Sequence, residues 1–480
     1  MSTHKSDSSD YQHEFLPSEH TARTLVLCFD GTGNEIDKDH TNVSQFFAML
    51  RKDDCQKQMV YYQTGIGTYT NKKFGPIASV MAKTFDSMFG GGIDSHIKDG
   101  YEFLMQNYRA NDRICIFGFS RGAYTARALA GMIHKVGLLP PSNIRHIEYA
   151  YRAFLKTDHA GWAMAREFKD SFSIDVDIEF VGIWDSVGSV GIGMPGLPFS
   201  NANTTIKYFR HALSLDERRA RFQANVWKSY ENTKSSKAGG RFIPSIANKR
   251  EMELGTGHSS KEQETDVEEV WFSGCHSDVG GGAVHHGIRH SLARISLRWM
   301  VRQCFLTGTG IIFTTDSIKK LGFDPNSLYP AVSQRPAPLP VEDLEIRRVP
   351  KPRTTLTKLR QGEWPDEPEP KQMSEEEEEL YDALTPSYDQ LELKRAWWLL
   401  EIVPAMRRSV VNDEVVKTFR PNLGGARIVA AQHRFGVKVH RSVKARMQAS
   451  YEPGRASDEK PAGHPYAPKV HFSVDPTWVD

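Results

Sequence analysis

The sequence predicts an α/β protein with a mostly parallel sheet flanked by helices. From Thr24 to about Arg302, short apolar runs alternate with helical stretches, as in sheets whose strands are joined by crossover helices. The apolar runs are nearly continuous, which is typical of strands buried on both faces. Glycine-rich turns follow at least four of them, where open α/β sheets bind ligands. We expect strands at Thr24–Asp30, Met59–Thr64, Arg113–Phe119, Asp177–Asp185 and Val267–Cys275.

The length and the net charge of the chain limit the classes of protein to which it could belong. A chain of 480 residues can bury a large core in one big domain or in two to three. The formal net charge is +2, from 61 basic and 59 acidic residues, so we expect no nucleic-acid partner. Five scattered cysteines indicate reduced structural thiols. Met1–Glu19 is polar, and no apolar run approaches the ~18 residues that span a bilayer, so we expect a cytoplasmic protein.

Changes in amino-acid composition along the chain divide it into five parts. We expect a disordered tail at residues 1–22, the main α/β domain at 23–322 and a proline-rich and acidic linker or long loop at 323–390. An accessory helical or β extension is expected at 391–450 and a loose C-terminal tail at 451–480. The acidic run Glu375–Glu379 has a second interpretation, as a docking segment. The extension contains Phe435–Val443, which alternates like a strand and is expected to pack on the main domain.

The segment Gly118-Phe119-Ser120-Arg121-Gly122 has the form of a nucleophile elbow. A β-branched and aromatic run precedes it, and a helix-forming stretch, Ala123–Lys135, follows at once. The glycines allow the backbones to pass closely around a strained turn, and the free N–H groups of the helix favour a developing oxyanion. The sequence therefore predicts an α/β-hydrolase-like fold with Ser120 as the nucleophile.

Two further residues complete a candidate triad in the chain order that such hydrolases use. Asp185 ends one predicted strand and His276 ends another, so we expect Asp185 to orient His276 and His276 to act as the base. Asp278 is the alternative orienter, although its position suggests that it shapes the Gly-Gly-Gly turn. The alternative bases lie beyond the strand end and are His285, His286 and His290.

The end of the first strand is a candidate oxyanion or substrate loop. The N–H of Arg121 is one expected donor, and the others are expected in the loop formed by Asp30, Gly31, Thr32 and Gly33. Two other interpretations stay open. Asp30 could merely fix the loop, or the loop could carry aspartyl-phosphatase chemistry, which is disfavoured because Cys28 replaces the first aspartate of that pattern.

The stretch Gly65–Gly92 contains apolar residues at helical spacing and ends in three glycines. It predicts either an ordinary amphipathic helix or a lid hinged at the glycines. Phosphate-loop motifs are missing, and no cysteine or histidine cluster has zinc spacing, so we expect neither a cofactor nor a metal.

Four ordered motifs resemble a known family. They are Phe29–Asn34, Gly118–Tyr124, Gly182–Gly188 and His276–Gly282, and a fifth block, Ala212–Arg219, lies between the aspartate and the histidine. Together they resemble the α/β-hydrolase domain of type VI secretion phospholipase effectors and their mainly fungal relatives, over about residues 23–305 and a fungal-like tail. The resemblance implies Ser120 as nucleophile, Asp185 as orienter, His276 as base and hydrolysis of lipid esters.

These observations predict a serine hydrolase, an esterase, lipase or phospholipase, acting on a lipid-like or small ester. Transient contact with a membrane surface is expected, and the oligomeric state is left open. One alternative is an inactive hydrolase-fold scaffold that binds partners. The other is an acyltransferase that uses the same triad.

Overall fold

We describe the fold from a computed structural model of the chain. It describes residues 14–18, 22–31, 40–65, 92–187, 197–199, 203–227, 264–285, 288–342, 344–348, 373–411, 414–429, 432–452 and 463–480. Every helix within these ranges is too short or too polar to cross a membrane. The proposed lid helix within residues 66–91 lies outside them.

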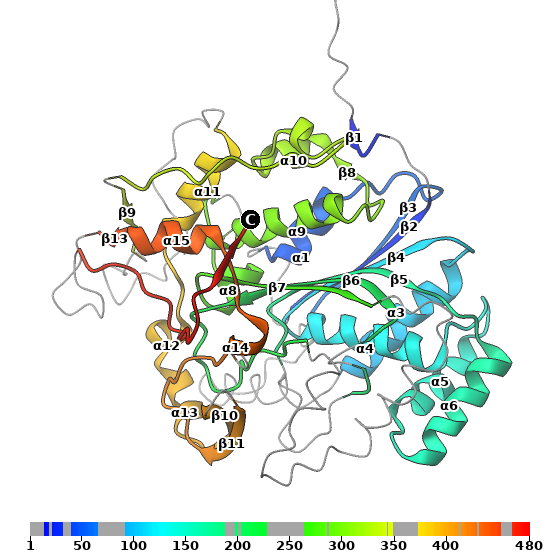
Figure 1. Ribbon diagram of the computed structural model, residues 1–480. Helices are drawn as coiled ribbons and strands as arrows, with labels where there is room; N and C mark the ends of the chain where they lie inside the picture. Colours follow the sequence, from blue (N-terminus) through cyan, green and yellow to red (C-terminus); the bar gives the residue numbers. More distant parts are fainter. Residues whose placement is uncertain are drawn as a thin grey trace, which may run out of the picture.

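An eight-stranded sheet in which every neighbouring pair is parallel forms the centre of the protein (Figure 1). Its strands, in spatial order, are β14 (Thr477–Val479), β12 (Lys438–His440), β7 (Asp266–Phe272), β6 (Ile206–Ser214), β5 (Ile178–Trp184), β4 (Arg113–Phe119), β2 (Thr24–Phe29) and β3 (Gln58–Gln63). The central strands are almost fully buried, as their apolar runs predict. The predicted α/β fold with a parallel sheet is confirmed.

Helices cover both faces of the sheet (Figure 1). One face packs against α3 (Ile93–Asn107), α4 (Arg121–Val136), α5 (Ile144–Leu155) and α6 (His159–Phe172). The other packs against α1 (Asn42–Met49), α9 (Leu292–Leu306) and α10 (Thr315–Lys320). A third apolar cluster joins the end of the sheet to α11 (Glu375–Ala383) and α15 (Arg441–Gln448).

Short elements complete the described structure. Two small sheets pair β1 (Phe15–Leu16) with β8 (Phe313–Thr314) and β9 (Glu345–Ile346) with β13 (Ser450–Tyr451). A hairpin is formed by β10 (Ala405–Val411) and β11 (Glu414–Arg420). The remaining short helices are α8 (His276–Gly280), η2 (Pro325–Ser327), α12 (Gln390–Leu393), η3 (Arg395–Trp397), α13 (Trp398–Glu401) and α14 (Gln432–Phe435).

The C-terminal part of the chain contributes more to the main sheet than its composition suggests. Residues 477–479, expected in a loose tail, form β14 of the main sheet. The stretch expected to be one strand at 435–443 contributes only β12, because the His440 side chain accepts the N–H of Ser442 and starts α15. At the other end, Phe15 and Leu16 of the expected disordered tail pair with β8.

A second strand of the main sheet, β6, was also not expected. β6 carries Lys207, Arg210 and His211, and these polar side chains interrupt the apolar pattern of a buried strand. In the structure, Arg210 Nη2 lies 2.9 Å from Asp266 Oδ2, and His211 Nδ1 lies 2.8 Å from Glu269 Oε1. Partners on β7 therefore satisfy charges that would otherwise oppose burial.

Candidate active site

Ser120 lies in the sharp turn between β4 and α4. Its φ of 59° and ψ of −117° are a strained conformation for a residue other than glycine. A Cβ on Gly118 would lie 2.5 Å from the Gly122 carbonyl oxygen, and one on Gly122 would overlap the Phe29 carbonyl. Both glycines are therefore needed for the turn, as the elbow pattern predicts.

His276 Nδ1 lies 2.5 Å from Asp185 Oδ2. Asp185 directly follows β5 and is fully buried, and His276 begins α8 shortly after β7. The N–H and the hydroxyl of Ser214, at the end of β6, donate to Asp185 Oδ1 at 3.0 and 3.1 Å. Since parallel strands end at one edge of the sheet, Ser120, Asp185 and His276 share that edge.

Aromatic rings surround the imidazole of His276. The Phe119 ring lies 4.6 Å from it between centroids, and the Phe222 ring meets it edge-on at 4.9 Å. Burial lowers the pKa of His276 despite the opposing effect of Asp185. The imidazole is therefore held neutral near pH 7, as a general base requires.

The carboxylate of Asp185 also binds Arg427. The guanidinium makes two parallel bonds, with Nη1 2.6 Å from Oδ1 and Nη2 2.9 Å from Oδ2. Burial acts to raise the pKa of Asp185, but Arg427 and His276 outweigh it and lower that pKa well below its usual range. Nothing in the sequence near Arg427 signals this contact, because its partner is 242 residues away in the chain.

A second buried ion pair lies beside His276. Glu217 and Arg219, in the block after β6, are joined by bonds of 3.0 and 2.8 Å. Burial opposes ionisation of Glu217, but Arg219 lowers its pKa to about 2. The Arg219 guanidinium lies 3.5 Å above the Phe222 ring, so this pair supports one wall around His276.

The loop after β2 is fixed by Asp30. The Asp30 carboxylate accepts bonds from the Gly31 N–H at 2.6 Å, the Thr41 hydroxyl at 2.8 Å and the Tyr62 hydroxyl at 2.5 Å. Burial nevertheless raises the pKa of Asp30. Of the interpretations left open, this geometry favours a loop-fixing role. Thr32 and Gly33 lie outside the described residues.

Asp278 contacts the C-terminal region, and none of its described hydrogen bonds reaches the His276 imidazole. Its Oδ2 accepts the N–H of Cys275 at 2.8 Å, the Ser387 hydroxyl at 3.2 Å and the N–H of Tyr388 at 3.0 Å. Burial raises its pKa to about 6. It caps the start of α8, whereas the sequence suggested that it shapes the Gly-Gly-Gly turn that follows.

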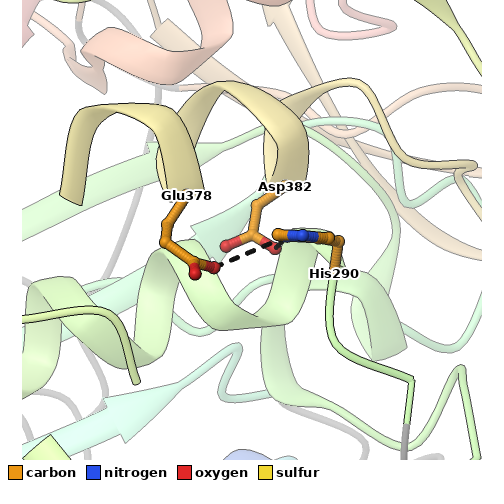
Figure 2. A group of neighbouring side chains, drawn as sticks. All are labelled: His290, Glu378 and Asp382. Carbon is orange, nitrogen blue, oxygen red and sulfur yellow. Dashed lines mark hydrogen bonds and ion pairs between the residues drawn. The ribbon is translucent and has the colours of Figure 1, made fainter. Parts of the chain in front are cut away.

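A candidate metal cluster contains one of the competing histidines. Figure 2 shows His290 beside Glu378 and Asp382, with Nδ1 3.6 Å from Glu378 Oε2 and 3.3 Å from Asp382 Oδ1. Arg298 lies 2.6 Å from Asp382, and Arg294 lies 3.1 Å from Glu378. Because these guanidiniums already compensate the carboxylates, the cluster fits a buried ion-pair network better than a cation site.

A second candidate group is Glu379, His440 and Asp480. Arg335 lies 2.7 Å from Glu379 and 2.9 Å from Asp480, and Arg441 lies 2.9 Å from Glu379. Its carboxylates are compensated in the same way. His285 is described but is not part of either group, and His286 lies outside the described residues.

A small pocket lies beside α8, and none of the candidate triad residues lines it. Its walls include Ser277, Asp278, Tyr388 and Arg347, whereas Ser120 and Asp185 do not line it. We therefore do not assign it to the substrate.

Comparison with known proteins gives a family match over the catalytic part of the chain. Residues 23–303 match the model described as "T6SS, Phospholipase effector Tle1-like, catalytic domain". The curated "Uncharacterized protein YEL023C" of Saccharomyces cerevisiae is 36% identical over 242 residues, which are 46% of this chain and 35% of that relative. The chain thus matches about a third of that relative's length.

Two solved structures are similar over part of the chain. An uncharacterized protein from Pseudomonas aeruginosa is 18% identical with a TM-score of 0.34, over 65% of this chain and 49% of that one. The structure of the Tle1 effector bound to the VgrG spike from the type 6 secretion system is 17% identical with a TM-score of 0.29, over 58% and 55%. The family match covers more than half of the sequence. The chain belongs to the family of Tle1-like phospholipase effector catalytic domains.

Proposed function

We propose that this protein is a serine hydrolase that cleaves carboxylic esters of lipids through an acyl-enzyme. The observation that carries the proposal is the 2.5 Å contact between His276 Nδ1 and Asp185 Oδ2, at the sheet edge where Ser120 lies in its strained turn. This arrangement has the three chemical groups, in the order along the chain, that the triad mechanism needs.

Ser120 Oγ attacks the acyl carbonyl carbon while His276 Nε2 takes the hydroxyl proton. Asp185 holds Nδ1–H and stabilises the imidazolium. His276 then gives the proton to the leaving alcohol, and a water molecule, activated by the same imidazole, releases the acid. The roles of the three residues are part of the proposal.

The oxyanion forms at the start of α4. The N–H of Arg121 is one assigned donor, because it follows the nucleophile at the helix N-terminus. The N–H of Gly31 donates to Asp30 Oδ1, and a second donor from the same loop stays a prediction from the sequence, because Thr32 and Gly33 lie outside the described residues.

A lipid substrate is supported by the family description, which names a phospholipase effector. Exposed large apolar side chains on α13, on β11 and just after β11, which we call the apolar surface, support contact with a membrane. This surface consists of Trp398, Leu399, Ile402, Phe419 and Leu423. Their exposed fractions reach 57% at Ile402 and 71% at Phe419, which is unusual for large apolar side chains.

The apolar surface is connected to the candidate triad. Trp397 precedes it in the chain, and its ring lies 5.8 Å from that of Phe222, which in turn contacts His276. The exposed cations Lys394 and Arg395 flank the surface. Apolar side chains with basic neighbours favour an anionic lipid surface, and we propose such a surface as the occupant.

The test is a comparison of wild type with Ser120→Ala. A fluorophosphonate probe reports serine reactivity, and p-nitrophenyl esters of graded chain length and a fluorogenic phospholipid report turnover. We expect labelling and turnover in wild type and neither in the variant. Ser95→Ala, at an exposed serine of α3, is the matched control and should behave as wild type.

A folded wild-type protein that neither labels nor turns over would contradict the proposal and favour the scaffold. Labelling with acyl transfer to an added alcohol in preference to water would favour the acyltransferase.

A further inference from the structure

We propose that Arg427 is a positioning residue of the active site, so that the C-terminal region completes the catalytic unit. The inference rests on the proposed function, because it assigns Asp185 to the triad. Arg427 lies outside the family match at residues 23–303. It binds Asp185 through both guanidinium nitrogens and is itself buried.

The Arg427 guanidinium donates hydrogen bonds to three parts of the site. Besides Asp185, Nη1 donates to the Ser214 hydroxyl at 2.7 Å and to the Ser214 carbonyl at 3.2 Å. Nε and Nη2 donate to the Phe222 carbonyl at 2.9 and 2.6 Å. Arg427 therefore joins the end of β5, the end of β6 and the loop whose Phe222 ring contacts His276. A planar fork suits such a site better than a lysine ammonium does.

The segment that carries Arg427 is itself bound to this loop. Glu401 Oε1 accepts the N–H of Ala220 at 2.5 Å, and Arg407 Nη1 donates to the Ala220 carbonyl at 2.7 Å. Asn422 Nδ2 donates to the Arg218 carbonyl at 2.7 Å and to Glu401 Oε2 at 2.5 Å. These contacts from α13, β10 and the residues after β11 hold the segment that carries Arg427 against the loop that contains Phe222.

We expect the positive charge of Arg427 to affect the protonation state of His276. The charged groups around His276 are Asp185, which Arg427 binds, and Glu217, which Arg219 binds. Each buried carboxylate is thus matched by one guanidinium, and the imidazole faces a nearly neutral surrounding. Without Arg427, the excess negative charge of Asp185 would favour the imidazolium and lower the fraction of free base at neutral pH.

The experiment compares Arg427→Met and Arg427→Lys with wild type in the full chain. The readouts are the pH dependence of fluorophosphonate labelling, the NMR titration of the His276 imidazole and thermal unfolding. In Arg427→Met we expect labelling at neutral pH to fall on the order of tenfold. The midpoints of labelling and of the His276 titration should both move to higher pH by about one unit. Arg427→Lys keeps the charge, so its midpoint should stay near that of wild type while its labelling rate falls.

Arg446→Met is the matched control. Arg446 is a fully buried arginine of the same region, and its Nη1 donates to the Thr385 carbonyl at 2.7 Å, away from the triad. We expect this variant to lose stability and to keep the wild-type midpoint. An equal shift in this control would overturn the proposal, as would wild-type rate and midpoint in a folded Arg427→Met protein.

Two outcomes separate this inference from the proposed function. If wild type does not label, the proposed function fails, but the NMR titration still shows whether Arg427 controls the charge of His276. If Arg427→Met does not fold, the lysine variant decides: a wild-type labelling rate in Arg427→Lys contradicts a role for the forked contact.

Discussion

Gly122 packs directly against the backbone carbonyl of Phe29, and this contact joins the nucleophile turn to the end of the first strand of the sheet. A Cβ on Gly122 would overlap the Phe29 carbonyl carbon and oxygen. Backbone atoms on both sides of the contact leave little room to relax.

We therefore expect Gly122→Ala to destabilise the protein by about 2 kcal/mol or more and to abolish fluorophosphonate labelling. Thermal unfolding and labelling measure the two effects. The control is Gly308→Asn, because Gly308 has a left-handed φ of 63° that asparagine tolerates and no atoms near its Cβ position. Normal labelling by Gly122→Ala would show that the elbow is not as tight as described.

We expect replacement of the two candidate orienting carboxylates to have different effects on the labelling rate. Asp185→Asn should slow labelling by several orders of magnitude, on the order of 10⁴, because the amide disturbs the tautomer of His276. Asp278→Asn should keep at least half of the wild-type rate, since Asp278 binds Tyr388 and Ser387 and not the imidazole. The reverse pattern in labelling rates would make Asp278 the orienter.

Asp278 also predicts a stability effect. Its pKa of about 6 lies above the usual value for an aspartate, so the fold favours the protonated form. That contribution is complete below about pH 4 and is lost as the pH rises through about 6. Chemical denaturation of wild type and Asp278→Asn between pH 4 and 7 should show a flatter pH dependence in the variant. An unchanged slope would contradict the raised pKa.

The lowered pKa of His276 predicts the pH dependence of labelling. Because burial favours the neutral imidazole, labelling should rise with pH through a midpoint below about 6.5, the ordinary value for histidine. Stopped-time labelling from pH 4.5 to 8 measures the midpoint, and Ser120→Ala provides the background. A midpoint clearly above 6.5 would mean that Asp185 outweighs burial.

The parallel sheet, the elbow and the order of the three candidate triad residues could all be predicted because each depends on local pattern. The apolar run before Ser120 and the glycines around it specify the turn directly. Five of the sheet strands were expected within a few residues of their observed bounds. β6 was missed because Arg210 and His211 look like surface charges until their partners on β7 are known.

Arg427 could not be predicted for a different reason. A contact between residues 242 positions apart leaves no local periodicity, and an arginine after two glycines is typical of an exposed loop. The role of Asp30 was left open because only the structure places Thr41 and Tyr62 on its carboxylate.

The buried cluster of His290, Glu378 and Asp382 is expected to behave as an ion-pair network. Asp382→Asn should lower the free energy of unfolding by about 3 kcal/mol, since it leaves Arg298 buried with less compensation. Addition of EDTA should not change the melting temperature of wild type. A large decrease with EDTA, reversed by a divalent cation, would identify a metal site instead.

The exposed apolar surface predicts how the protein meets its substrate. Phe419→Asp removes the most exposed of its large apolar side chains and adds a negative charge, so binding to vesicles containing anionic phospholipid should weaken by about tenfold. Cosedimentation with such vesicles measures binding, and hydrolysis of a short soluble ester should stay within twofold of wild type because Phe419 is not a candidate triad residue. Leu306→Asp is the matched control, since Leu306 is also exposed, at 55%, but lies at the end of α9 and outside this surface. Equal loss of vesicle binding in both variants, or none in Phe419→Asp, would show that this surface does not contact the membrane.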